Sequence, residues 1–159
     1  NSLKTTGGGT TANLQYLQAL NLRDKNTKNP AVLNGDPFDP ATYTNFRDWL
    51  LNANAANMAY MLSAQMSATA LNVRLNPVSD QSGVRVGGVS GGAIVYAPGT
   101  KSANALGFAK INDLLSEANA ELSINGLTIT QTATRSYQEA LKIAFDKATN
   151  NLNFVQPAP

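Results

Sequence analysis

The sequence predicts a mainly α-helical fold of about four or five amphipathic helices, with short β elements near 84–97, 127–130 and 152–156. Apolar residues recur at helical spacing in several long stretches of the chain. Clusters of glycine, proline and asparagine separate these stretches, and the alternation typical of strands occurs only in short runs. A chain of 159 residues has the length of one ordinary domain and can bury a sizeable core.

The chain begins with a glycine-rich segment, NSLKTTGGGTT, over residues 1–11. Three consecutive glycines lose a large conformational entropy when they become ordered, and the segment has few apolar atoms to offset that loss. We therefore expect a leader that a neighbouring subunit orders as an intersubunit tether. A single helical domain is expected over residues 12–156, followed by a short tail at 157–159.

The first third of the chain predicts two helices joined by a loop. Residues 12–22 place leucines at near-helical spacing, whereas residues 24–40 are rich in residues that break helices. Asp39 and Pro40 predict the start of a helix over about 40–52, because aspartate caps helix N-termini and proline fits the first helical position.

A longer helix is predicted over about 55–73, with an inward-facing apolar row. That row contains Ala59, Leu62, Met66, Ala70 and Val73. Residues 83–99 then change to short β-branched runs separated by glycines, which predicts a small β-hairpin or a glycine-rich surface loop.

The C-terminal half predicts two further amphipathic helices, over about 104–122 and 135–149. The second aligns one row of residues on its inward face: Tyr137, Leu141, Ala144, Phe145 and Ala148. The Asn-Gly pair at 125–126 predicts either a C-cap for the first of them or a tight turn. Ser136 and Glu139 have the spacing of a capping box at the start of the second.

The composition excludes several classes of function. The chain has no cysteine and no histidine, which removes disulfide scaffolds, thiolate zinc sites and the commonest general base. Its twelve basic residues are scattered singly and the net charge is only +2, so a nucleic-acid partner is not expected. No apolar run approaches the roughly 20 residues that a membrane-spanning helix needs. Only 14% of residues are charged while nineteen are asparagine, a composition that leans towards a secreted bacterial protein and offers little electrostatic resistance to self-association.

The segment NFRDWLLNANAANMAYMLSAQ, residues 45–65, holds two candidate sites. Arg47, Asp48 and Trp49 are adjacent, so on a helix they point in different directions, and we expect Trp49 to pack in the core. Arg47 or Asp48 is expected to form a salt bridge or to bind a loop carbonyl. The three methionines at 58, 61 and 66 contain soft sulfur that can bind Cu(I), but flexible filling of the core explains them more simply.

The segment NGDPFDP, residues 34–40, offers oxygen ligands that a hard cation such as calcium prefers. Asn34, Asp36 and Asp39 are the calcium candidates. Their spacing does not match an EF-hand loop, and Asp39 is expected to cap a helix, so a capped turn is the favoured interpretation. We therefore expect no cofactor and no metal.

Phosphate-loop and hydrolase patterns are also absent. In PGTKS a threonine separates glycine from lysine, and the glycine cluster before it lacks the spacing of a dinucleotide-binding loop. A serine nucleophile would need a lysine base, yet no S-x-x-K motif is present, and spacing alone pairs none of the ten carboxylates. These observations predict a protein that is not an enzyme.

Residues 38–73, FDPATYTNFRDWLLNANAANMAYMLSAQMSATALNV, resemble a module of large secreted bacterial surface proteins, which carries similar F-R-D-W-L, N-M-A-Y-M-L-S-A-Q and L-N-V runs. The resemblance continues through IVYAPG (94–99), GFAKINDLLSEANAEL (107–122) and RSYQEALKIAFDKATNNLNFV (135–155). It implies an exported, modular protein, and the family has no settled activity or catalytic residues to carry over. Related modules often begin with a cysteine-containing, aromatic-rich stretch, whereas this chain starts at a glycine-rich tract.

The sequence thus leads to two functional hypotheses. The first is a secreted structural protein at the cell surface or outside the cell, a subunit of a homopolymeric filament or surface assembly. The alternative is a monomeric adhesion module that recognises surface glycans or a cell-wall component.

Overall fold

The computed structural model describes residues 11–25, 35–75 and 89–150. These residues form five helices and a two-stranded antiparallel sheet, which confirms the predicted mainly α-helical fold class. In chain order the elements are α1 (Ala12–Gln18), α2 (Tyr43–Leu51), α3 (Met58–Leu75), β1 (Ile94–Tyr96), β2 (Phe108–Lys110), α4 (Ile111–Ile124) and α5 (Ala133–Thr149). Residues 1–10 of the predicted leader, the predicted β elements at 84–88 and 152–156, and the tail at 157–159 lie outside the described residues.

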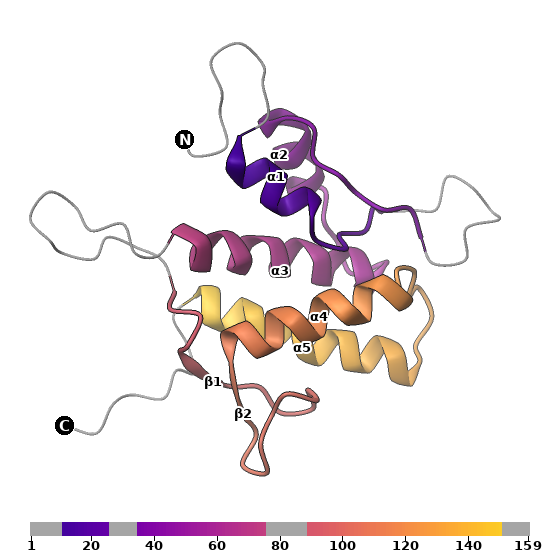
Figure 1. The fold of residues 1–159 in the computed structure, drawn as a ribbon. Helices are drawn as coiled ribbons and strands as arrows, with labels where there is room; N and C mark the ends of the chain where they lie inside the picture. The colour runs from indigo at the N-terminus through magenta and orange to yellow at the C-terminus, as the bar shows by residue number, and fades with distance from the viewer. Residues whose placement is uncertain (1–10, 26–34, 76–88, 151–159) are drawn as a thin grey trace, which may run out of the picture.

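Helix α3 lies between two layers of the fold (Figure 1). The pair α1 and α2 covers one side of it, and α4 and α5 cover the other, with the small sheet beyond them. Ten of the eighteen residues of α3 are buried. A helix that is buried on opposite sides needs apolar or satisfied polar groups around most of its circumference, and α3 accordingly mixes alanine, methionine, serine and threonine.

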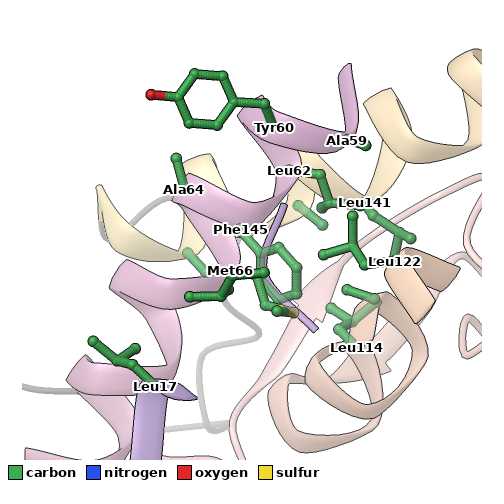
Figure 2. Packing of buried hydrophobic residues seen from close by; sticks show 14 of the residues in the cluster. Leu17, Ala59, Tyr60, Leu62, Ala64, Met66, Leu114, Leu122, Leu141 and Phe145 are labelled. Carbon is green, nitrogen blue, oxygen red and sulfur yellow. The ribbon is translucent and has the colours of Figure 1, made fainter. Parts of the chain in front are cut away.

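The apolar row predicted for this helix is largely confirmed. Ala59, Leu62, Met66 and Ala70 are buried, and Val73 is half-buried. Figure 2 shows Leu62 and Met66 on the side of α3 that meets Leu141 and Phe145 of α5, while Tyr60 and Ala64 project towards a different side. The row predicted for α5 is largely confirmed as well, because Leu141, Ala144, Phe145 and Ala148 are buried and Tyr137 is half-buried.

The predicted start of α2 is wrong. Thr42, rather than Asp39, is the N-cap, and its hydroxyl oxygen accepts a hydrogen bond from the Asn45 amide at 3.1 Å. The segment before it stays extended because the Gln18 side-chain amide donates to the Pro40 carbonyl at 2.9 Å. Helix α1 likewise ends at Gln18 instead of continuing to residue 22.

Trp49 packs in the core, as predicted. Its side chain is 5% exposed, and its ring stacks on Phe38 at a centroid distance of 4.3 Å and an interplanar angle of 3°. Phe46 and Tyr60 lie at 5.8 and 5.4 Å from the same ring. The indole Nε1 donates to the Arg23 carbonyl at 3.2 Å, so the polar atom of this buried ring is also satisfied.

The sheet forms differently from the prediction. β1 lies within the predicted β region, but its partner β2 occupies residues that we expected at the start of a helix. The register pairs Ile94 with Lys110, Val95 with Ala109 and Tyr96 with Phe108. Gly107 has a φ of 83°, a conformation that favours glycine, and this turn places β2 beside β1 and delays the start of α4 to residue 111.

The connection between α4 and α5 contains no strand in its described residues, so the β element predicted at 127–130 is wrong. Thr128 instead binds the first amides of α3, which begins at Met58 rather than near 55. The predicted capping box of α5 is also wrong. The helix begins at Ala133, because the side chain of Thr132 caps it through the Arg135 amide at 3.2 Å.

Replacing Trp49 with alanine should lower the free energy of unfolding by roughly 3–5 kcal/mol, because a large buried ring leaves a cavity among Phe38, Phe46 and Tyr60. Chemical denaturation of the full chain measures the change. Leu51→Ala is the matched control, since Leu51 lies two residues further along α2 and is 76% exposed. A Trp49→Ala variant as stable as the wild type would contradict the packing role.

Candidate functional site

The buried polar residues of the fold meet around Thr128. Its amide donates to the Asn57 side-chain oxygen at 3.0 Å, and its carbonyl accepts from the Met58 amide at 3.1 Å. Its hydroxyl accepts from the Ala59 amide at 3.0 Å and donates to the Gln138 side-chain oxygen at 2.5 Å. Every polar atom of Thr128 therefore bonds within the protein, and the group acts in folding rather than in chemistry.

Two arginines that the sequence did not single out bind backbone carbonyls. Arg23 donates to the carbonyls of Leu122, at 2.8 Å, and Ser123, at 3.3 Å, in the last turn of α4. Burial lowers the pKa of Arg23. Arg135 donates to the carbonyls of Thr128 and Ala55. A guanidinium near a helix C-terminus stabilises the unpaired carbonyls there, so Arg23 connects the α1 layer to α4.

Glu117 of α4 fastens the loop between the two strands. Its carboxylate accepts from the amides of Lys101 and Ser102, both at 2.7 Å, and from the Tyr137 hydroxyl at 2.6 Å. The Lys101 ammonium lies 4.4 Å from the centre of the Tyr137 ring. Burial acts to raise the pKa of Glu117, but the hydrogen bonds that its carboxylate accepts outweigh burial, so its pKa lies below the ordinary value. Burial, together with the hydrogen bond and charge of Glu117, raises the pKa of Tyr137. Because its oxygens are occupied, Glu117 is a structural carboxylate.

The predicted candidates do not form a catalytic group. Arg47 and Asp48 pair with each other at the surface, where Arg47 donates twice to Asp48 Oδ1 at 2.7 and 3.0 Å. The prediction of a salt bridge is confirmed, although we expected these neighbours to point apart. The contact forms because the long Arg47 side chain reaches back to the adjacent carboxylate.

The methionines and the calcium candidates differ in burial and do not gather into one site among the described residues. Met58 and Met66 are buried in the core, and Met61 is half-buried beside a shallow groove between α2 and α3. Asp36 is half-buried and Asp39 is exposed, while Asn34 lies outside the described residues. Within the described ranges, no three His, Cys, Asp or Glu side chains are grouped to hold a metal ion.

The outer face of the sheet is mostly apolar, with the exposed Lys110 beside Ile94 at one end. Val95 and Ala109 are buried on its inner face, whereas Ile94 and Tyr96 are 41% and 43% exposed. Phe108 is half-buried with its ring 5.3 Å from that of Tyr96. We call Ile94, Tyr96, Phe108 and the 76% exposed Leu106 of the adjoining turn the hairpin face.

The outer edge of β1 has no paired strand among the described residues. Hydrogen bonds from Ala97 to Gly107, at 2.7 Å, and from Ile111 to Ala93, at 3.1 Å, show that alternate residues of β1 direct their backbone groups towards β2. Ile94 and Tyr96 therefore direct theirs outward. Among the residues that the structure describes, none bonds to these outward groups.

A polar depression of about 310 Å³ lies beside α2, and we call it the α2 depression. It is lined by Asp24, Lys25, Phe38, Asn45, Asp48, Trp49, Asn52 and Tyr60. The Tyr60 hydroxyl donates a hydrogen bond to the Trp49 carbonyl. Burial, and to a smaller extent the charge of Asp24, raises the pKa of Tyr60 to about 12. Tyr60 is thus a neutral part of the wall at ordinary pH.

Comparison of this chain with known protein families, with curated proteins and with solved structures finds no significant match. No helix in the described part of the chain is long and apolar enough to cross a bilayer. The hairpin face and the α2 depression are two exposed features of the described residues that a partner can reach.

The stability of the fold should depend on pH through Glu117. Its folded-state pKa is lowered, so its contribution is fully present above its ordinary pKa of 4.5 and is lost as the pH falls through the lower folded-state value. The difference in free energy of unfolding between the wild type and Glu117→Gln should therefore shrink on acidification below 4.5. Glu139→Gln, at an exposed carboxylate of α5, is the control and should show no such change. A difference for Glu117→Gln that stays constant across this range would contradict the assignment.

Proposed function

We propose that this protein is a secreted, non-enzymatic structural protein, a subunit of an extracellular filament or surface assembly. The main support for self-association is the composition of the hairpin face. An antiparallel sheet that is covered on one side normally places polar residues on the other, and here isoleucine, tyrosine and phenylalanine occupy three of the four outer positions, with Lys110 at the fourth. Secretion to the cell surface rests on the resemblance of residues 38–73 to modules of exported surface proteins.

The charge distribution around the sheet favours a second copy of the chain as the partner. Residues 86–100 carry no charged side chain, so two copies of β1 meet no like-charge repulsion. Natural proteins protect edge strands with charges, prolines or bulges. β1 lacks a charge, and Pro98 lies beyond its last residue. The strand is therefore a suitable template for pairing with another extended segment.

The leader, residues 1–11, is the segment that we assign to this edge in a neighbouring subunit. Its glycines permit close approach of two backbones, and its threonines tolerate extended geometry. Strand addition supplies backbone hydrogen bonds that offset the ordering entropy of the leader. Because the donor and acceptor surfaces differ, the contact is head-to-tail and can propagate into a filament.

A non-enzymatic role is supported by the use that the fold makes of its ionisable groups. Arg23, Arg135 and Glu117 each satisfy backbone groups, and Arg47 pairs with Asp48. The chain also lacks histidine and cysteine, which supply most general bases and nucleophiles.

Deleting residues 1–10 should leave a folded protein that no longer assembles, because the leader contributes the added strand while Thr11 stays in place as the N-cap of α1. Light scattering and electron microscopy of the full and truncated chains at micromolar concentration measure assembly, and circular dichroism verifies folding. Ile94→Lys should likewise prevent assembly, since it places a charge on the hairpin face. Ile129→Lys is the matched control at an isoleucine outside the hairpin face that is 63% exposed, and it should assemble like the wild type.

Two results would overturn the proposal. The first is a full-length chain that stays monomeric at high concentration, in which case the adhesion module takes the place of the filament subunit. The second is normal assembly by both the truncated chain and Ile94→Lys, which would place the intersubunit contact on another surface.

A further inference from the structure

We propose that the α2 depression binds a neutral oligosaccharide chain. The inference is independent of self-association, because the depression is lined from α2. Helix α2 lies on one side of α3, whereas the sheet lies on the opposite side (Figure 1). Its volume of about 310 Å³ is at the lower end of the range of ligand pockets, about 300–1,000 Å³, and suits one end of a chain.

Three polar side chains line the depression from one stripe of α2. Asn45, Asp48 and Asn52 follow the spacing i, i+3, i+7, which places them on the same side of the helix. All three are exposed. A row of this kind, fixed on a helix, presents polar atoms at set separations to a repeating ligand.

The side-chain atoms that remain available in this row include one donor group and two acceptors. Asn45 uses its side-chain oxygen to accept from the Ala41 amide at 3.2 Å, which leaves its NH₂ group as a donor. Arg47 occupies only Oδ1 of Asp48, so Oδ2 remains an acceptor. Asn52 donates to the Asp48 carbonyl at 2.7 Å, which leaves its side-chain oxygen as a second acceptor. Sugar hydroxyls both donate and accept, so they match such a mixed row.

The charges around the depression favour a neutral ligand over an ion. Asp48 is paired with Arg47, and the lining carboxylate of Asp24 has Lys25 as its neighbour in the chain. Two carboxylates and two cations balance, so the site has no net charge that would concentrate an anion or a cation.

The floor of the depression is aromatic. Phe38 and Trp49 both line it, stack in parallel at 4.3 Å and are 8% and 5% exposed. An apolar floor beneath a polar row matches a sugar ring, which has hydroxyl groups around its rim and C–H groups on its faces.

The test is an NMR titration of the isotope-labelled full chain with chitotriose, cellotriose and maltotriose. We expect at least one trisaccharide to shift the amide signals of Asn45, Asp48 and Asn52 and the Trp49 indole N–H signal. The double variant Asp48→Ala/Asn52→Ala should weaken that binding by about tenfold or more, because it removes two hydrogen-bond acceptors.

The chain contains a matched control. At the end of α5, Asp146 pairs with Lys142, and the Asn150 side chain donates to the Asp146 carbonyl at 2.9 Å, which repeats the Asp48–Asn52 arrangement without lining the depression. Asp146→Ala/Asn150→Ala should bind the trisaccharide like the wild type. The proposal is overturned if no trisaccharide shifts these signals, if both double variants bind equally, or if CaCl₂ alone shifts them while no saccharide does. Assembly by a variant that has lost saccharide binding would show that the two surfaces act separately.

Discussion

The burial of α3 between two layers is the constraint on which the rest of the structure depends. The first amides of a helix have no partner within it, and at a buried end water is not available to bond them. Asn57 and Thr128 fill this role: Asn57 accepts from Ala59, and Thr128 accepts from both Met58 and Ala59. Thr128 also binds Gln138 of α5, so the same residue that completes α3 sets the position of the last helix. This junction therefore joins the start of α3 to α5.

The sequence predicted those features that depend on local periodicity. The apolar rows of α3 and α5 and the burial of Trp49 are readable because neighbouring turns of one helix repeat the same pattern. Features with distant partners were missed. β2 looked helical because Gly107 and its pairing with β1 override local preference, and Arg23 looked unremarkable because it binds carbonyls about a hundred positions away along the chain. The helix starts were misplaced because several residues near each start can serve as caps and tertiary contacts choose among them.

The candidate site shows the same division. The sequence identified Asp48 and Trp49 as noteworthy but gave no means of knowing that Phe38 and Asn52 line the same depression. The partly buried Arg23, Glu117 and Arg135 form hydrogen bonds with backbone groups, so the functional proposals rest on surface residues. The two surfaces differ in chemistry: we propose the mostly apolar sheet face for another copy of the chain and the polar depression for a hydroxyl-rich ligand. A surface protein that both assembles and adheres would need one of each.

The most direct test of the central claim is the free energy of unfolding of Thr128→Val. Valine keeps the shape of threonine but removes the hydroxyl, which leaves the Ala59 amide and the Gln138 side-chain oxygen without this partner in a buried place. The account predicts a loss of about 1–3 kcal/mol for Thr128→Val and near-wild-type stability for Thr128→Ser, which retains the hydroxyl. A Thr128→Val variant as stable as the wild type would contradict the claim that this junction holds α3 in place.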